Sequence, residues 1–188
     1  DSFAGAYAKH GGKQLRNRIE HAQVLTGADI ARFPDLALIA SMQPTHATSD
    51  MNMAEDRLGS ARIKGAYAWQ SFLKQNTVVA AGSDFPVEYP NPFFGLHAAV
   101  TRQDHHNQPA GGWFPKQALS LQQALRAFTL DAAWAAHQEK ELGTLEAGKY
   151  ADFILIDRDI FARPASELWQ TRVLETWVGG KQVYPAQR

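Results

Sequence analysis

Two almost uninterrupted apolar segments constrain the fold of this chain more than any other feature. The first, LALIASMQP, covers Leu36 to Pro44 and stops at a proline, and the second, VVAA, covers 78–81. A shorter candidate strand at 17–20 ends at His21. Strands this apolar are typical of a parallel sheet that is buried on both faces. These segments therefore predict an α/β fold.

Helical patterns alternate with these strands. TGADIARF predicts a short helix, and the apolar positions within 60–75 recur about every 3.6 residues, which predicts a second. The segment 120–138 begins with Ser120 and Gln123 in the spacing of a capping box, which predicts a third. Residues 45–59, by contrast, are predicted to form a polar loop.

Beyond residue 138 the pattern becomes all-β. ADFILID and VLETWV predict short strands, and Gly179-Gly180 before KQVY predicts a two-residue hairpin loop. We therefore predict two domains, an α/β portion over 1–137 and a β-rich segment over 138–188.

The composition excludes several classes of function. The chain has 19 Lys plus Arg and 19 Asp plus Glu, with no basic segment interleaved with aromatic residues, so nucleic acid is not an expected partner. No stretch approaches the roughly 18 apolar residues that span a bilayer, so no membrane partner is expected. Because there is no cysteine, a bound metal must take His, carboxylate or water as ligands. No feature fixes the compartment, and the cytoplasm is the default expectation.

Polar side chains stand where each strand of the predicted sheet ends. His21 follows the first strand, Gln43 to His46 follow the second, and Asp84 follows the third. The carboxyl ends of parallel strands meet at one edge of a sheet, so these side chains are predicted to share one cleft. Imidazole and carboxylate are ligands that Zn²⁺ accepts. His21 and Asp84 are therefore candidate metal ligands.

Each of these residues also has a common structural explanation. The GSD at 82–84 is an ordinary turn or helix cap, and a single His at a strand end is often a hydrogen-bonded structural residue. His46 either contacts a substrate or makes a hydrogen bond that stabilises its loop. Two protein ligands are also fewer than the three of a typical catalytic zinc site. The residues alone leave these alternatives open.

A series of motifs, taken in order, resembles the carboxyl-terminal part of the amidohydrolase superfamily, specifically its amidohydrolase-3 or YtcJ-like branch. The motifs are RNRIEHAQV, SMQPTHATSDM, GAYAWQSFL, AGSDFPVEYPNPFFGLHAAVTRQ, LSLQQALRAFTLDAAWAA and LGTLEAGKYADFILID. The likeness covers nearly all of residues 15–184. It implies a partial TIM-type (β/α) barrel, made of strands 6 to 8 and their helices, followed by part of a small β-sandwich.

The resemblance also implies a site and a reaction. His21 takes the place of the family's metal-binding His after the sixth strand, and Asp84 takes that of the Asp after the eighth, which binds metal and acts as the catalytic base. His46 lies on the same rim as a candidate substrate contact. The implied cofactor is a divalent metal, expected to be zinc, with one or two ions in the complete enzyme. The implied function is hydrolysis of a non-peptide, amide-type C–N bond in a small molecule by a metal-activated water.

The chain departs from this family in its ligand set. The family also uses an H-x-H pair after the first strand, a Lys after the fourth and a His after the fifth, and no H-x-H occurs here. An eight-stranded barrel takes about 250 residues, so this chain has room for three strands. We therefore expect a carboxyl-terminal fragment that is inactive alone and forms oligomers or associates with a missing amino-terminal half. The alternative is a non-catalytic fragment or degenerate binding module without a complete metal site.

Overall fold

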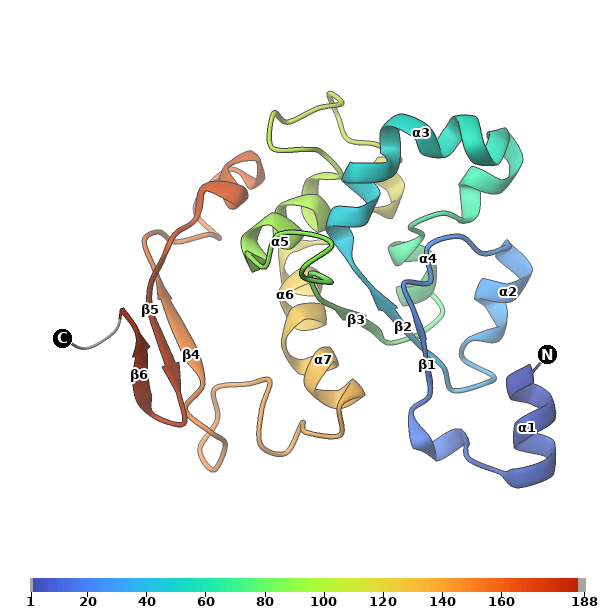
Figure 1. The fold of residues 1–188 in the computed structure, drawn as a ribbon, viewed down its shortest axis with the longest axis horizontal. Coiled ribbons are helices and arrows are strands. Elements are labelled where there is room, and N and C mark those ends of the chain that lie inside the picture. Colours follow the sequence, from blue (N-terminus) through green and yellow to red (C-terminus); the bar gives the residue numbers. More distant parts are fainter. Residues whose placement is uncertain (1, 186–188) are drawn as a thin grey trace.

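The computed structural model describes residues 2–185, which form two three-stranded sheets with helices between them (Figure 1). The first sheet contains β1 (Arg18–Glu20), β2 (Ile39–Met42) and β3 (Val79–Ala81). The second contains β4 (Phe153–Ile156), β5 (Val173–Val178) and β6 (Lys181–Tyr184). The fold class is therefore α/β, as predicted.

The helices are mostly short. They are α1 (Ser2–His10), α2 (Gly27–Arg32), α3 (Pro44–Arg62), α4 (Trp69–Leu73), α5 (Pro92–Thr101), α6 (Leu121–Phe128) and α7 (Leu130–Ala135). Four 3-10 helices cover Lys13–Leu15, Ile63–Gly65, Pro115–Gln117 and Ala165–Gln170. Over residues 2–185, none of these helices combines the length and the apolar character that a bilayer crossing requires.

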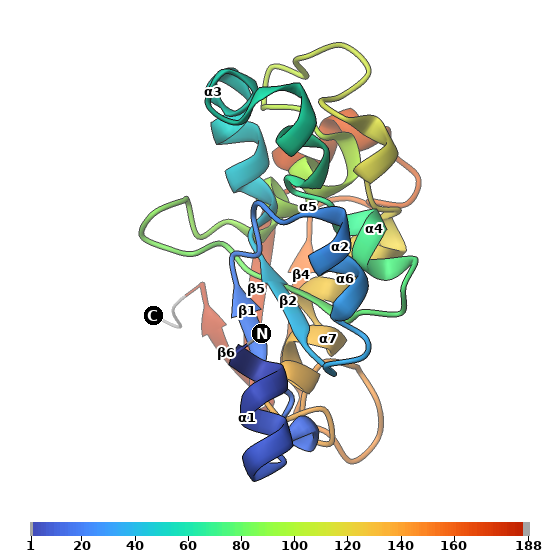
Figure 2. The ribbon, with the colours of Figure 1, turned by 90° about the vertical axis from the view of Figure 1, so that its right-hand side faces the viewer.

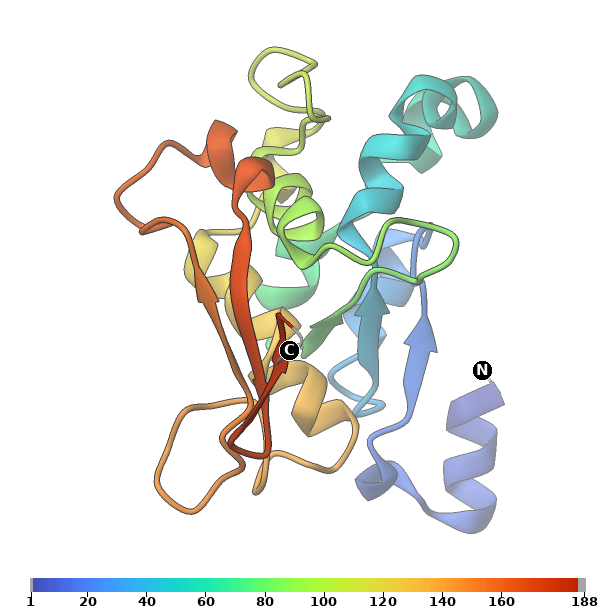
Figure 3. The same cartoon turned by 60° about the vertical axis from the view of Figure 1, so that its left-hand side comes forward.

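The first sheet is parallel, with β2 in the middle. Arg18 is paired with Ile39, and Ala40 with Val79. Figure 3 shows β1 and β2 as arrows that point the same way, toward the first turn of α3. The prediction of a parallel sheet with its carboxyl ends at one edge is confirmed.

The main core lies where helices pack against the parallel sheet. Helices α4, α6 and α7 pack against β3, and α6 and α7 lie between the two sheets (Figure 1, Figure 2). On α4, Phe72 is fully buried and meets Phe33 edge to face, with ring centroids 4.8 Å apart. Aromatic pairs in this geometry contribute about 0.5–1.5 kcal/mol beyond the apolar area that they bury.

The prediction of a polar loop over 45–59 is wrong, because these residues belong to α3. Pro44 at the first helical position has a backbone angle that already suits a helix. An apolar stripe with helical spacing, formed by Ala47, Met51, Ala54 and Leu58, packs against the core. The stripe is narrow and surrounded by polar side chains, which is why the segment resembles a loop in sequence.

The predicted helix over 60–75 is interrupted by non-helical residues at 66–68, and only 69–73 of its second half are α-helical. The cause is a close backbone approach, since the Gly65 carbonyl accepts a hydrogen bond from the Leu25 N–H at 3.1 Å. A Cβ atom at Gly65 would lie 1.7 Å from the Leu25 carbonyl oxygen. Contact with a distant segment therefore overrides the local helical pattern.

The predicted helix over 120–138 forms as two helices, because Thr129 has φ −122° and ψ −87° between α6 and α7. The predicted capping box is confirmed: the Ser120 side chain accepts from the Gln123 N–H, and the Gln123 side chain accepts from the Ser120 N–H. Helices α1 and α5 were not predicted. For α5 a signal was present, because Asn91 caps the helix and Pro92 follows at its first position.

The Ser120→Ala variant is expected to lower the free energy of unfolding by about 1 kcal/mol, the usual cost of losing a cap side chain. The physical reason is that the Gln123 N–H loses its acceptor at the start of α6. Urea unfolding measures the change. Gln122→Ala, an exposed residue of the same helix, is the matched control. Equal stability of the two variants would show that the cap contributes nothing.

The strands predicted beyond residue 138 form the antiparallel sheet β4-β5-β6. Gly179 and Gly180 connect β5 to β6 with positive φ angles of 55° and 76°, as a two-residue hairpin of this class requires. The hairpin prediction is confirmed. The division into domains at 137/138 and the β-sandwich assignment stay predictions.

Candidate metal centre

Three side chains meet at the carboxyl edge of the parallel sheet. His21 follows β1, His46 is the third residue of α3 and Asp84 follows β3. Each offers one ligand atom, and these atoms all lie within 4.8 Å of one another. The three side chains that the strand ends predicted to lie together therefore do so, and they include the residue proposed as a substrate contact.

The backbone around this cluster adopts unusual conformations. His21 has φ 67° and Asp84 has φ 60°, both in the left-handed region. Asp and His enter this region more readily than most side chains, yet such conformations still cost about 1–3 kcal/mol and gather at functional sites. The Asp84 carbonyl accepts from the Val87 N–H at 2.8 Å, which closes a turn after the strand. The chain therefore turns sharply at both residues, after β1 and after β3.

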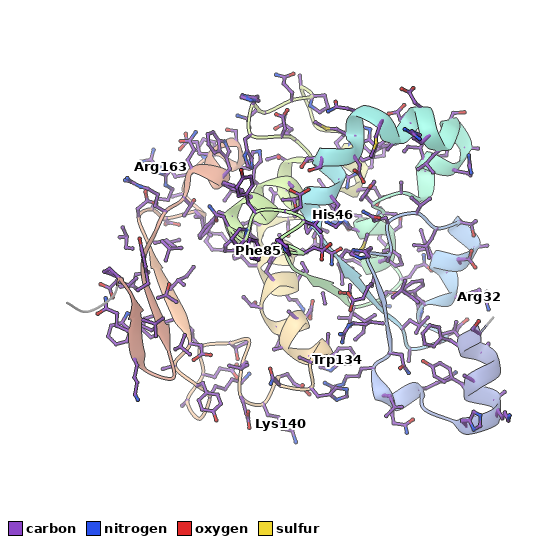
Figure 4. All side chains as sticks on the ribbon, viewed as in Figure 1. Arg32, His46, Phe85, Trp134, Lys140 and Arg163 are labelled. Atoms are coloured by element: carbon purple, nitrogen blue, oxygen red, sulfur yellow. The ribbon has the colours of Figure 1, made fainter. Side chains whose placement is uncertain are left out.

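Asp84 lies between the two imidazoles. Its Oδ2 is 3.4 Å from His46 Nε2 and 3.8 Å from His21 Nδ1. The two rings stack with centroids 5.6 Å apart and an interplanar angle of 29°. Figure 4 labels His46 at the beginning of α3 and Phe85 in the loop after β3. The cluster therefore combines residues from all three strand ends.

Exposure differs strongly among the three side chains. That of His46 is 9% exposed, that of Asp84 33% and that of His21 48%. Asp84 and His21 are therefore accessible to a dissolved molecule. His46 forms the inner wall of the site.

Two glutamines hold the imidazoles: Gln43, which the sequence placed at the same edge without a role, and Gln23, which it did not single out. Gln43 Oε1 lies 3.0 Å from His21 Nδ1, and Gln23 Nε2 lies 3.1 Å from His46 Nδ1. A signal was available in the sequence, because Gln23 lies two residues after His21 and Gln43 lies three residues before His46. Uncharged amides of this kind orient imidazoles that bind metals or substrates.

The residues present fit a divalent cation. Two imidazoles and a carboxylate within one small volume are the borderline nitrogen and hard oxygen donors that zinc accepts. His46 Nε2 is buried and makes no hydrogen bond, although Asp84 Oδ2 lies 3.4 Å from it, so the site contains a polar atom that a ligand would satisfy.

Larger hollows lie elsewhere on the molecule. One of about 550 Å³ lies between the α6–α7 region and β4, whereas a cavity of about 230 Å³ adjoins the cluster and is lined by Glu20, Ser41, Gln43 and residues of the β3 end. We place the candidate site at the cluster itself, which is the one set of three or more potential metal ligands found in residues 2–185, although none of its three residues lines either hollow.

A family model described as "Amidohydrolase family" matches residues 1–184, so the likeness extends to the amino-terminal residues as well. Three curated relatives are similar. Protein LONG AFTER FAR-RED 3 of Arabidopsis thaliana is 39% identical over 98% of this chain and 31% of its own length. The putative amidohydrolase YtcJ of Bacillus subtilis is 32% identical over 98% of this chain and 35% of its length. N-substituted formamide deformylase of Arthrobacter pascens is 32% identical over 59% of this chain and 20% of its length.

Solved structures are similar as well. An uncharacterized metal-dependent hydrolase from Pyrococcus horikoshii superposes with a TM-score of 0.71 at 27% identity, over 86% of this chain and 33% of that one. An adenosine deaminase from Xanthomonas campestris, solved with bound zinc, gives a TM-score of 0.62 at 21% identity, over 96% of this chain and 42% of that one. At this identity the likeness shows the fold alone. The chain spans 31% and 35% of the two curated relatives that it matches almost throughout.

Proposed function

This chain belongs to the amidohydrolase family, in its amidohydrolase-3, YtcJ-like branch, and from that premise we propose that the full-length protein is a metal-dependent hydrolase acting on an amide-type, non-peptide C–N bond. The observation that carries the proposal is the meeting of His21, His46 and Asp84 at one strand edge. The name of the deformylase relative supports the choice of bond.

His21 and Asp84 would hold the cation, for which we propose zinc. A divalent cation bound here would lower the pKa of its bound water toward neutrality. Asp84 Oδ2 then accepts a proton from the attacking water and later delivers it to the leaving amine. His46, whose Nε2 lacks a partner, contacts the substrate oxygen. The substrate is a small molecule, in keeping with the size of the adjoining cavity.

The remaining ligands would come from outside residues 1–188. A catalytic zinc site usually has three protein ligands, and the family uses more. Among the described strands β1 pairs with β2 alone, so one of its edges is open to a further strand. We therefore propose that β1, β2 and β3 are the last strands of a TIM-type barrel and that the later sheet is part of a β-sandwich. The 188-residue chain by itself would be inactive and would form oligomers or associate with the amino-terminal half.

Activity of the zinc-loaded full-length protein tests this function. We expect release of amine from a panel of N-formyl and N-acetyl amines, loss of that activity with a chelator, and recovery when zinc is added. The matching esters measure preference for the C–N bond. Stoichiometric zinc without hydrolysis of any amide would contradict the proposal and favour a non-catalytic binding module.

The His21→Ala variant of the full-length protein is expected to bind zinc more than 100-fold more weakly than the parent. Losing a residue that only hydrogen-bonds to a ligand typically costs 10- to 100-fold, and the loss of a direct ligand should exceed this. The reason is that a direct ligand is removed while Asp84 stays in place, so excess zinc should restore part of kcat. Competition with a chromogenic chelator measures the affinity. His10→Ala, an exposed histidine of α1, is the matched control. Unchanged zinc affinity in His21→Ala would remove His21 from the ligand set.

A further inference from the structure

The two glutamines at the site are arranged crosswise with respect to the histidines. Gln23 stands two residues after His21 but bonds to His46, and Gln43 stands three residues before His46 but bonds to His21. Backbone hydrogen bonds fix the main chain at both glutamines. The backbone carbonyl of Gln23 accepts from the Tyr67 N–H, and the backbone carbonyl of Gln43 accepts from the His46 N–H. Each histidine is thus oriented by the segment that carries the other.

The contact between Gln23 and His46 places a proton on one ring nitrogen. The amide nitrogen of Gln23 only donates hydrogen bonds, so His46 Nδ1 must accept. A neutral imidazole that accepts at Nδ1 carries its proton at Nε2. The charge of Asp84 favours the same arrangement, since its Oδ2 lies 3.4 Å from His46 Nε2 and would repel a lone pair there.

The contact between Gln43 and His21 has the opposite effect. The amide oxygen of Gln43 only accepts hydrogen bonds, so His21 Nδ1 must donate. A neutral His21 therefore carries its single proton at Nδ1 and has a free electron pair at Nε2. That pair is what a cation requires, since a neutral imidazole binds metal through its unprotonated nitrogen.

We propose that Gln23 and Gln43 are positioning residues that fix opposite tautomers in the two stacked histidines. His21 becomes a metal ligand through Nε2, and His46 becomes an N–H donor to the substrate oxygen instead of a further ligand. The buried His46 Nε2, which has no hydrogen-bond partner, is the atom that makes this contact. The role of His46 toward substrate rests on the proposed hydrolase function, whereas the tautomers do not.

The tautomers are measured directly in the metal-free full-length protein by ¹⁵N NMR of its histidine rings. We expect a protonated Nδ1 and an unprotonated Nε2 in His21, and the reverse in His46. The same tautomer in both rings would overturn the proposal. Because the parent chain alone decides this point, the result does not depend on whether any variant folds.

Two variants that each replace a glutamine by glutamate then test whether the glutamines set the tautomers. In Gln23→Glu the new carboxylate only accepts, so Nδ1 of His46 should become protonated. In Gln43→Glu the acceptor is kept, so His21 should retain its proton at Nδ1. A His46 ring with an unprotonated Nδ1 in Gln23→Glu would show that Gln23 does not set the tautomer.

Zinc affinity and kcat of the full-length protein show whether His46 donates a hydrogen bond to the substrate or binds the metal. We expect His46→Met to bind zinc within about threefold of the parent but to lose about 10²- to 10³-fold in kcat, as when one donor to a developing oxyanion is removed. His46→Gln keeps an N–H near the Nε2 position and should retain at least tenfold more kcat than His46→Met. If His46→Met loses zinc affinity as His21→Ala does, His46 is a ligand and the proposal fails. If the parent hydrolyses no amide although both tautomers are as expected, only the hydrolase function fails.

Discussion

Replacing Asp84 by asparagine in the full-length protein is expected to lower kcat about 10³-fold or more, with zinc content largely retained. Asparagine keeps the size of the side chain and an oxygen ligand but cannot accept the proton of the attacking water. General acid–base groups typically contribute 10²- to 10⁴-fold, and Asp84 also sits against both imidazoles. Steady-state kinetics at saturating zinc, with metal analysis of the same samples, measure both quantities.

The matched control is Asp56→Asn, an exposed carboxylate on α3 outside the cluster, which should keep kcat. Added zinc should leave the defect of Asp84→Asn unchanged, whereas it should restore part of the rate of His21→Ala. If Asp84→Asn kept more than a tenth of the parental kcat, the carboxylate could not be the catalytic base. Asp84 would then be assigned as a ligand alone.

The Phe72→Ala variant is expected to lower the free energy of unfolding by about 3–5 kcal/mol, the usual cost of truncating a buried phenylalanine. Phe72 is fully buried in the main core and packs against Phe33. The change leaves a cavity that the rigid neighbours fill only in part. Domains are stable by about 5–15 kcal/mol in total, so the variant should lose a substantial part of its stability.

Denaturant unfolding of the full-length protein, followed by tryptophan fluorescence, measures this loss. Phe161→Ala is the matched control, because the Phe161 side chain is 59% exposed and its truncation should change stability by less than about 0.5 kcal/mol. Equal losses in the two variants would show that the cluster around Phe72 is not the core that stabilises the parallel sheet.

Local patterns in the sequence were sufficient for the strands and the hairpin. The segments 36–44 and 78–81 are almost entirely apolar, and strands β2 and β3 form within them, as such runs do wherever a buried sheet accepts them. Gly179-Gly180 specifies its turn because few other residues adopt two successive positive φ angles. The capping box of α6 is equally local, since its two partners lie three residues apart.

The helices were harder to predict, because their stability depends on contacts with distant residues. The apolar stripe of α3 is narrow, and only its packing on the core makes a helix favourable over 45–59. The break after Gly65 has its cause at Leu25, forty positions earlier in the chain. A helical period in one segment therefore says little about where that helix ends.

For the candidate site, the sequence by itself singled out three side chains that meet at one sheet edge, and the tertiary structure decided how they are held. His21, His46 and Asp84 could be named because each follows a strand, and parallel strands bring their ends to one edge. The partners Gln23 and Gln43 could not be assigned, because an amide side chain acquires a role only when an imidazole from another segment comes within hydrogen-bond distance. In our proposal these contacts, made between the segments that follow β1 and β2, decide which ring nitrogen keeps its proton, and no local pattern encodes them.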